Sequence, residues 1–461
     1  MRIIFRLVKW LAALAVLAVA GIAGWLAVAP PDLIRVGAAY SAKIVCSNVF
    51  VAGRDAKDVM ALDVQAPGHW LLGFMTADVD KANRRVDASL FGLFGRSTAV
   101  MREGLGCASA PDGDVTKAAG AALKPFEAAA GAGSWPAGDE VAPSQNPEIA
   151  KILDDAALTG PGMRAVVAVK DGRIIGERYG EGFDKETPLL GWSATKTVNA
   201  ALIGAAIKAG KLSLDDRPLK KLPLTKEPAG WRRDEISIAD LMAMSSGLEF
   251  NEDYGAVADV TRMLFLEPDM ASFAASKPVA GEVGKTFNYS SGTATFLSRL
   301  WQDAVGTGAL DWPREKLFRP LRMNSAVLET DESGTFVGSS YMYATARDWA
   351  RFGQFLIQKG VWEGQEILPA GFVDWMAEPA PASNGAYGRG QVWLQGPGRG
   401  QRPDIELGVP VDAYWMRGHD GQTVTIIPSK QMVVVRLGLT PSRLGYRPSI
   451  LVGALVKAAE Q

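Results

Sequence analysis

The first long apolar run of the chain lies close to its N-terminus. From Trp10 to Ala29 the sequence WLAALAVLAVAGIAGWLAVA contains no charged residue, and three basic residues come before it. Twenty helical residues, at about 1.5 Å each, span the ~30 Å hydrocarbon core of a bilayer. The pattern predicts a transmembrane helix through residues 10–29 and a signal anchor over residues 1–31, whose basic end stays in the cytoplasm.

Two other interpretations of this run stay open. Ala27-Val28-Ala29 fits the small-x-small cleavage pattern of a signal peptide, although Pro30 and Pro31 directly after it make a poor start for a mature chain. The second interpretation is a buried core helix, but a core helix would not need the three basic residues that come before the apolar run. With an uncleaved anchor, we expect a single-pass protein of a bacterial inner membrane whose residues 32–461 face the periplasm.

Short β-prone runs broken by turn residues follow, and they predict a small α+β lobe over residues 32–111. The runs are HWLLGFMTADVD, RRVDASLFG and STAVMRE. Cys46 and Cys107, the two cysteines of the chain, bracket this lobe. In an oxidising compartment they would pair, and closing a loop of about sixty residues contributes roughly 4 kcal/mol. Two unrelated buried thiols are the alternative.

An Ala, Gly and Pro-rich stretch at 112–147 is typical of a linker, and one large domain follows over 148–461. The domain opens with RAVVAVK and RIIGERYG around Asp171-Gly172, a strong two-residue hairpin signal. Apolar residues at helical spacing predict helices at 195–212 and 345–360. Strands at 422–428 and 431–440 and a last helix at 448–460 follow. The expected fold class is α/β (α+β): an antiparallel sheet built from both ends of the domain, with flanking helices and an inserted helical lobe.

Charge and composition narrow the possible partners. The 49 Lys and Arg residues nearly balance 50 Asp and Glu, for a net charge of −1, so we expect no nucleic-acid partner. The two histidines, His69 and His419, and the two cysteines are scattered singly. Such spacing does not supply a metal-ligand set, so we expect no metal and no organic cofactor.

Ser193-Ala194-Thr195-Lys196 is the one Ser-x-x-Lys sequence in the chain. At positions i and i+3 of a helix the two side chains share a face, so the amine lies within reach of the hydroxyl. A lysine removed from water gives up its proton more readily and then accepts the serine proton, which makes the pair a nucleophile with its base. The alternative is an N-cap serine beside a solvated lysine.

Two further polar elements accompany this pair. Tyr289, in Phe-Asn-Tyr-Ser-Ser-Gly before a predicted helix, would relay a proton as a phenol near a cation. Gly418-His419-Asp420-Gly421-Gln422 comes directly before a predicted strand, whose edge N–H groups suit an oxyanion. Taken alone, the Tyr289 element is also explained by a tyrosine packed at the start of a helix. The element Gly418–Gln422 is also explained by a plain surface turn.

Together these elements resemble the serine β-lactamase and penicillin-binding-protein superfamily, over about residues 148–461. The similar branch is the class C-related one, with family VIII-type esterases, D-aminopeptidases and 6-aminohexanoate-dimer hydrolases. Other segments that resemble the family are ISIADLMAMSSGLEF, PVAGEVGKTFNYSSG, LFRPLRMNSAVLET and SSYMYATARDWARFGQFLIQKG.

The resemblance implies a role for each matched residue. Ser193 would be the acylated nucleophile, Lys196 its base and Tyr289 the Tyr-x-Asn tyrosine. The triplet His419-Asp420-Gly421 occupies the Lys-Thr-Gly position, and the N–H groups of Ser193 and Gln422 would form the oxyanion hole.

Two positions depart from the β-lactamase pattern. Ser291 stands where Tyr-x-Asn has asparagine, and His419 stands where a lysine would meet a β-lactam carboxylate. Both changes resemble the esterase and amide-hydrolase branch. The sequence therefore predicts a membrane-anchored serine hydrolase that acts on a small ester, amide or peptide substrate.

Alternatives are a cell-wall D-amino-acid peptidase or carboxypeptidase, a catalytically idle binding protein on the same fold, and a membrane structural protein. Substrate choice depends on segments 251–285 and 378–415, whose conformations do not follow from the pattern. Three tryptophans near the motifs are candidates for an apolar acyl pocket, although large aromatic residues more often belong to a core: Trp192, Trp393 and Trp415.

Overall fold

The computed structural model describes residues 2–66, 68–120, 122–124, 131, 133–142, 146–221, 233–398, 400 and 402–460. Parts of the predicted linker, at 125–130, 132 and 143–145, lie outside the described residues, as do 399 and 401 of the segment 378–415.

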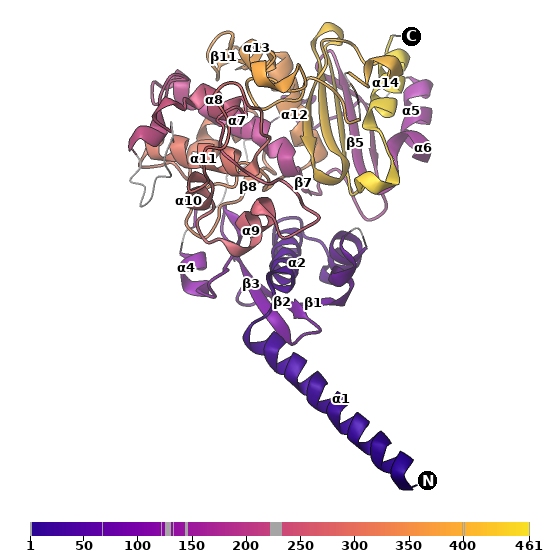
Figure 1. Cartoon of the computed structure of the whole chain (residues 1–461). Helices are drawn as coiled ribbons and strands as arrows, with labels where there is room; N and C mark the ends of the chain where they lie inside the picture. The colour runs from indigo at the N-terminus through magenta and orange to yellow at the C-terminus, as the bar shows by residue number, and fades with distance from the viewer. Residues whose placement is uncertain are drawn as a thin grey trace.

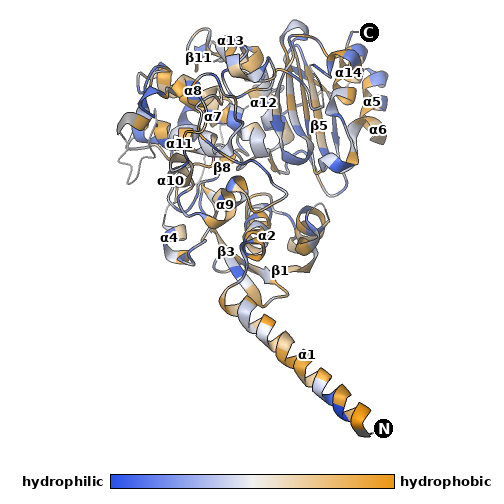
Figure 2. Ribbon diagram, in the orientation of Figure 1, coloured by the Kyte–Doolittle hydropathy of each residue, from blue (hydrophilic) through white to orange (hydrophobic). Residues whose placement is uncertain are grey.

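The apolar N-terminal run forms one long helix, α1 (Arg2–Val28), which projects away from the rest of the protein (Figure 1). It is apolar around most of its circumference (Figure 2), and Ile3–Val28 is long and apolar enough to cross a membrane. A helix of this length and composition near the N-terminus is typical of membrane anchors and of signal sequences.

The small lobe combines one long helix with an antiparallel sheet. Helix α2 (Asp32–Phe50) packs against a four-stranded sheet of β1 (Met75–Asp80), β2 (Arg85–Leu90), β3 (Phe94–Arg102) and β4 (Gly106–Ser109), paired in chain order. The three predicted β-prone runs contain β1, β2 and most of β3. Helix α2 was not among the expected elements. Thirteen of its nineteen residues are buried, on all sides of the helix, so its sequence lacks the one-sided apolar pattern of a surface helix.

A buried ion pair joins the lobe to the large domain. Lys43 of α2 pairs with Glu329, and the two side chains are only 2% and 0% exposed. The same carboxylate accepts hydrogen bonds from the Ser47 hydroxyl at 2.8 Å and from the Cys107 backbone N–H at 2.7 Å. Cys107 is joined by a disulfide to Cys46 of α2, which is the pairing that the sequence indicated. The lobe is therefore fixed against the large domain.

The described part of the predicted linker packs against the protein instead of running free. Trp135 is 3% exposed, and the Arg351 guanidinium lies 5.9 Å from its ring. Arg351 also donates to the backbone oxygens of Pro136 at 3.1 Å and Gly138 at 2.7 Å. An Ala/Gly-rich composition suggests flexibility, but the buried tryptophan and hydrogen bonds from arginines of the large domain hold this segment.

The large domain is built on a five-stranded antiparallel sheet in the order β12-β13-β14-β5-β6. Its middle joins segments that are far apart in the chain, because β5 pairs with β14. The predicted hairpin at Asp171-Gly172 and both predicted C-terminal strands are confirmed. The strands are β5 (Met163–Lys170), β6 (Arg173–Tyr179), β12 (Tyr414–Gly418), β13 (Gln422–Ile427) and β14 (Met432–Gly438).

Helices cover both faces of this sheet. Helix α12 (Ala346–Ile357) packs on one face, and α14 (Pro448–Ala458) and α5 (Pro147–Asp154) lie on the other (Figure 1). Helices α12 and α14 agree with the helices predicted at 345–360 and 448–460. Two short elements complete these layers, α6 (Ala156–Thr159) and α13 (Phe372–Ala377).

The inserted helical lobe lies beside the α12 face of the sheet (Figure 1). Its helices are α7 (Thr195–Lys208), α8 (Ile238–Met242), α9 (Asp259–Leu266), α10 (Met270–Ala275) and α11 (Ser291–Val305). The remaining short elements are α3 (Ala56–Val59), α4 (Val115–Ala119), β7 (Leu189–Leu190), β8 (Val327–Leu328), β9 (Met342–Ala344), β10 (Val361–Trp362) and β11 (Gln365–Glu366). The antiparallel sheet from both ends of the domain and the inserted helical lobe are thus confirmed.

Candidate active site

Ser193 lies in a tight turn, Trp192–Ala194, directly before α7. The residue before it, Trp192, has a left-handed backbone with φ +48°, which costs a non-glycine residue about 1–3 kcal/mol. Gly191 packs so closely on the Trp349 ring that a Cβ there would collide with it. Ser193 stays half-buried while its neighbours Trp192 and Ala194 are buried. The turn therefore holds the serine at the start of a helix with its side chain accessible.

Lys196 lies one helical turn beyond Ser193 and is 1% exposed. Its Nζ is 3.0 Å from the Ser193 Oγ, 3.0 Å from the Ser291 Oγ and 3.0 Å from the Ser339 carbonyl oxygen. The Lys196 amine donates to all three oxygens, so its N–H groups converge on Ser193, Ser291 and Ser339. The amine therefore lies within proton-transfer distance of the Ser193 hydroxyl.

Glu252 fixes the direction of the Ser291 hydroxyl. Its carboxylate accepts both the Ser291 O–H and the Ser291 backbone N–H, the latter at 2.8 Å. Because a carboxylate only accepts, the Ser291 hydroxyl must point its hydrogen toward Glu252 and present its lone pairs to Lys196. A negative charge thus lies one hydroxyl away from the amine, where it stabilises the cation that forms when Lys196 takes a proton.

Tyr289 lies between two cations. The Lys196 Nζ is 4.7 Å from the centre of the Tyr289 ring, on its face. On another side the Trp393 ring lies 5.2 Å away, and the Arg417 guanidinium packs on Trp393 at 4.3 Å. Burial lowers the pKa of Arg417 to about 10. Two basic side chains, Lys196 and Arg417, therefore lie near Tyr289, the first on its ring and the second on the neighbouring Trp393.

The predicted oxyanion element lies directly against the nucleophile turn. Gln422 begins β13 opposite Gly418 of β12, and a Cβ on Gly418 would collide with the carbonyl oxygen of Gly191. The Gln422 side chain turns back and donates to the His419 carbonyl at 3.0 Å, while its own oxygen accepts the Gly438 N–H at 2.8 Å. Gly421 has φ +88°, a conformation that glycine adopts without strain.

His419 is enclosed by aromatic rings. Its imidazole stacks on Tyr254 at 4.6 Å and meets the edge of Trp192 at 5.5 Å. Its Nε2 lies 3.4 Å from the Asp420 carboxylate, whose pKa burial raises above its usual value while His419 and Arg443 oppose that shift. The structure therefore places His419 beside the residue that precedes Ser193.

Two residues at this site, Glu252 and Tyr254, were absent from the sequence-based set. Both belong to the segment 251–285, and no local motif around NEDYG marks them. Burial raises the pKa of Tyr254 well above its usual value, with the charge of Glu252 adding to the effect, so its hydroxyl stays protonated.

The three candidate tryptophans have different surroundings. Trp192 lines a cavity that Tyr254 and His419 also border. Trp393 packs against Tyr289, as described above. Trp415 is fully buried in the core beneath α14, where its Nε1 donates to the Asp404 carboxylate at 3.3 Å. It does not line the cavity that Trp192 borders.

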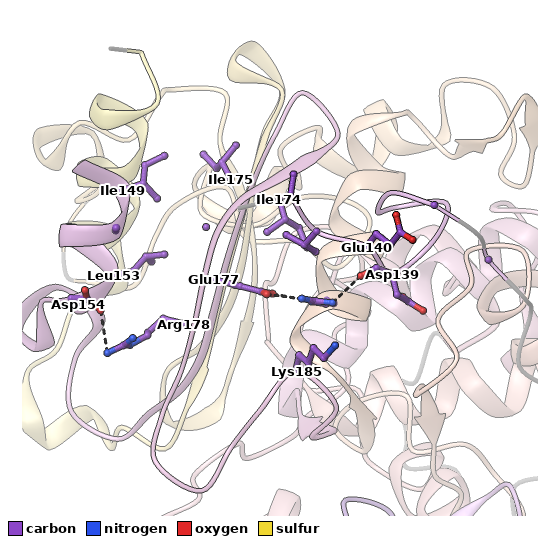
Figure 3. Close-up of a pocket in the computed structure, with 17 residues that line it drawn as sticks. Asp139, Glu140, Ile149, Leu153, Asp154, Ile174, Ile175, Glu177, Arg178 and Lys185 are labelled. Atoms are coloured by element: carbon purple, nitrogen blue, oxygen red, sulfur yellow. Dashed lines mark hydrogen bonds and ion pairs between the residues drawn. The ribbon is translucent and has the colours of Figure 1, made fainter. Parts of the chain in front are cut away.

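A cavity of about 990 Å³ lies apart from these residues, and its lining is shown in Figure 3. It lies at the edge of the main sheet between α5, β6 and the described part of the linker. Ile149 and Leu153 form one wall, and the Glu177–Arg347 ion pair crosses another. None of the sequence-predicted site residues lines it.

Comparison with known proteins agrees with this geometry. The model of the beta-lactamase family matches residues 155–446, more than half of the chain. The 6-aminohexanoate-dimer hydrolase of Paenarthrobacter ureafaciens is 24% identical over 301 residues, which cover 60% of this chain and 72% of that protein.

Solved structures share the fold. A Bacillus anthracis structure named as a candidate 6-aminohexanoate-dimer hydrolase has 22% identity and a TM-score of 0.55, covering 70% of this chain and 88% of that one. The hydrolase EstCE1 has 16% identity and a TM-score of 0.52, covering 68% of this chain and 98% of that one. On the match to the family model, the chain belongs to the beta-lactamase family of serine hydrolases.

Proposed function

We propose that this protein is a membrane-anchored serine hydrolase that cleaves an ester or amide bond through an acyl-enzyme on Ser193. The observation that carries the proposal is the 3.0 Å contact between the buried Lys196 Nζ and the Ser193 Oγ, with the other two positions of the amine occupied by Ser291 and Ser339. This arrangement is that of a nucleophile with its base.

In the acylation step the Ser193 Oγ attacks the substrate carbonyl carbon, and its proton moves to Lys196. The carbonyl oxygen becomes an oxyanion, for which we assign the backbone N–H groups of Ser193 and Gln422 as donors. Collapse of this intermediate breaks the bond to the leaving group. The proton passes from Lys196 to Tyr289, and Tyr289, assisted by His419, donates it to the leaving alcohol or amine.

Water completes the cycle. It attacks the acyl-Ser193 carbonyl while Tyr289 and Lys196 accept its proton, and the second tetrahedral intermediate releases the acid and restores the Ser193 hydroxyl. The Glu252 carboxylate accepts from Ser291 and so orients the hydroxyl that faces Lys196.

We propose esters and simple amides as the substrates in place of β-lactams. The Ser291 hydroxyl is engaged by Lys196 and Glu252, so it does not take over the role of an asparagine amide on the substrate. His419 stands among aromatic rings, where it does not offer the permanent charge that a β-lactam carboxylate favours.

We propose that α1 anchors the protein in the bacterial inner membrane as a single pass, with the catalytic domain in the periplasm. The basic residues Arg2, Arg6 and Lys9, in the first part of α1, support a cytoplasmic N-terminus. The disulfide between Cys46 and Cys107 supports an oxidising compartment for the residues that follow α1.

The test compares Ser193→Ala with wild type and with Ser276→Ala, an exposed serine far along the chain. Full-length protein in detergent is given p-nitrophenyl butyrate and a p-nitroanilide, and it is also labelled with a fluorophosphonate probe. We expect Ser193→Ala to lose labelling and at least about 10³-fold in kcat/KM, and Ser276→Ala to keep both. An unchanged rate in Ser193→Ala rejects Ser193 as nucleophile. Turnover confined to D-amino-acid peptides would instead favour a cell-wall peptidase, and a wild type that takes no label would favour an idle binding protein.

A further inference from the structure

A cavity of about 360 Å³ lies between the small lobe and the large domain, next to the candidate active site. Trp192, Tyr254 and His419 line it on the side of the large domain. The opposite wall comes from the small lobe, from α2 and from the turn Trp70–Phe74. Its volume lies within the range of about 300–1,000 Å³ that small-molecule sites occupy. The hydrolase domain alone would therefore leave this space open on one side.

The cavity is apolar over most of its lining and polar near the nucleophile. Its lobe wall is formed mainly by Leu33, Val36, Leu71 and Leu72. Phe265 adds to the apolar lining from the large domain, and His419 lies against Trp192, the residue directly before Ser193. The other polar lining residues are Tyr40, His69, Thr261, Asp420, Ser442 and Arg443. Such a lining favours an apolar chain that carries a polar, reactive group at one end.

The same lobe carries exposed apolar residues beside the exit of α1. Trp70 is 71% exposed, and its ring contacts that of Phe74 at 6.1 Å. Phe74 in turn contacts Phe91 at 5.2 Å, and Leu93 lies in the same turn as Phe91 and is 73% exposed. We call these four residues the lobe tip. Phe91 donates its backbone N–H to Phe74, and Leu93 directly precedes β3, the strand that contacts α1. A bilayer that holds α1 would therefore lie near the lobe tip.

The lobe tip and the cavity share a short segment of chain. In the turn Trp70–Phe74, the first and last residues belong to the lobe tip, while Leu71 and Leu72 line the cavity. Leu33, at the start of α2, lines the cavity only a few residues after α1 ends. One face of the lobe therefore meets the membrane surface and the adjacent face forms the cavity wall.

We propose that this cavity receives the apolar chain of an amphiphilic ester or amide that approaches from the bilayer surface, so that the small lobe selects substrates by their chain. The inference rests on the proposed hydrolysis at Ser193 and adds to it the substrate class. Recognition is by burial of a hydrocarbon chain against Val36, Leu72 and Phe265.

The first test measures chain-length preference with the full-length protein in nanodiscs. Two ester series are used, p-nitrophenyl esters of butanoic to dodecanoic acid and acetate esters of butyl to dodecyl alcohol. Each buried methylene raises kcat/KM by up to about fourfold, so we expect at least a tenfold preference for eight carbons over four in one series. Val36→Phe fills the cavity and is expected to reduce that preference to within about twofold. Leu72→Phe is the second variant if Val36→Phe does not fold.

Val411→Phe is the matched control, because Val411 is 70% exposed and lies outside the cavity. All variants share the same bilayer, so partitioning of long chains into lipid cancels when the variants are compared. Equal chain-length preference in Val36→Phe and Val411→Phe, or no preference in wild type, overturns the inference.

A second test does not depend on turnover. A twelve-carbon fatty acid with a terminal diazirine is photo-crosslinked to Ser193→Ala in nanodiscs, and the labelled peptides are mapped by mass spectrometry. We expect label on α2 and around Trp192, and its loss in the Val36→Phe background; label confined to α1 and the lobe tip overturns the inference. If the cavity is labelled but no ester is hydrolysed, the proposed chemistry fails alone. If short esters are hydrolysed without chain preference and the cavity stays unlabelled, the inference fails alone.

Discussion

Substitution of Glu329 by glutamine tests how strongly the small lobe is held by its buried ion pair. Glu329 is fully buried and accepts three hydrogen bonds, from Lys43, from the Ser47 hydroxyl and from the Cys107 N–H. Glutamine keeps the shape but removes the charge and directs an N–H₂ group at one of these donors. The Lys43 ammonium, packed 4.2 Å from the Tyr341 ring, is then left without its counter-charge.

Removing one partner of a buried pair costs about 3–5 kcal/mol of unfolding free energy. At about 2–4 °C per kcal/mol, the thermal midpoint is expected to fall by on the order of 10 °C. Lys43→Met is expected to cost a similar amount, because it leaves a buried carboxylate alone. The double variant Lys43→Met/Glu329→Gln removes both charges, so most of the loss is expected to be recovered.

Thermal unfolding followed by tryptophan fluorescence in one detergent measures all variants. Glu366→Gln is the control, because the Lys208–Glu366 pair is also a Lys–Glu ion pair but lies at the surface, with side chains 35% and 56% exposed. That variant is expected to change stability by less than about 1 kcal/mol. A double variant whose losses are the sum of the two single losses would refute the reasoning, since the two charges would then act independently.

The pH dependence gives a second check on Lys43. Burial lowers the pKa of Lys43, and Glu329 opposes this shift. The unfolded chain therefore holds that proton to higher pH than the folded chain, so stability rises with pH between the lowered value and the ordinary lysine value of about 10.4. In Glu329→Gln the opposing charge is gone, and this rise is expected to begin at a lower pH and to be larger.

Three further predictions follow from the site and the lobe. Glu252→Gln is expected to lower kcat/KM by roughly 10- to 100-fold, which is the effect of losing one hydrogen bond to a charged group. The thermal midpoint is expected to change little. An unchanged kcat/KM would show that Glu252 does not orient Ser291. Reduction of the Cys46–Cys107 disulfide is expected to lower the unfolding free energy by about 2–5 kcal/mol, measured by unfolding with and without dithiothreitol, and a Cys46→Ser/Cys107→Ser variant that is insensitive to dithiothreitol is the control. Burial raises the pKa of Asp331 to about 6, so the folded chain keeps a proton that the unfolded chain loses. The contribution of Asp331 to the unfolding free energy therefore falls as pH rises from about 4 to 6. Asp331→Asn is expected to flatten that slope in pH-dependent denaturation, and an unaltered slope would contradict the assignment.

The elements with a clear periodic pattern were predictable from the sequence. Asp171-Gly172 between two alternating runs specifies its hairpin locally, and the amphipathic spacing of 345–360 specifies α12. Helix α2 was not predictable by the same means, because small residues are buried on every side of it and its one buried lysine, Lys43, is explained only by Glu329 far along the chain.

The candidate site also contains residues that were predictable from the sequence and residues that were not. Ser193 lies in the turn that leads into α7 and Lys196 lies in the first turn of α7, so their contact follows from their spacing in the sequence. Glu252 and Tyr254 come from a segment without a regular pattern, and their places depend on what α11 and β13 present to them once the domain has folded. The wall that the small lobe contributes to the cavity depends on the docking of two parts of the chain, which no local pattern encodes.

The pairing of β5 with β14 in the middle of the main sheet has a consequence for biogenesis. The β5–β6 hairpin is made early, but the strands that complete its sheet and carry Gln422 come near the end of the chain. Long-range pairing of this kind is slow and leaves strand edges open until the last segment arrives. If the chain is exported as it is made, Ser193 reaches the periplasm well before its oxyanion donors can assemble around it. Hydrolytic activity would then begin only after translocation is complete, and a chain truncated before β13 would have no activity in either compartment.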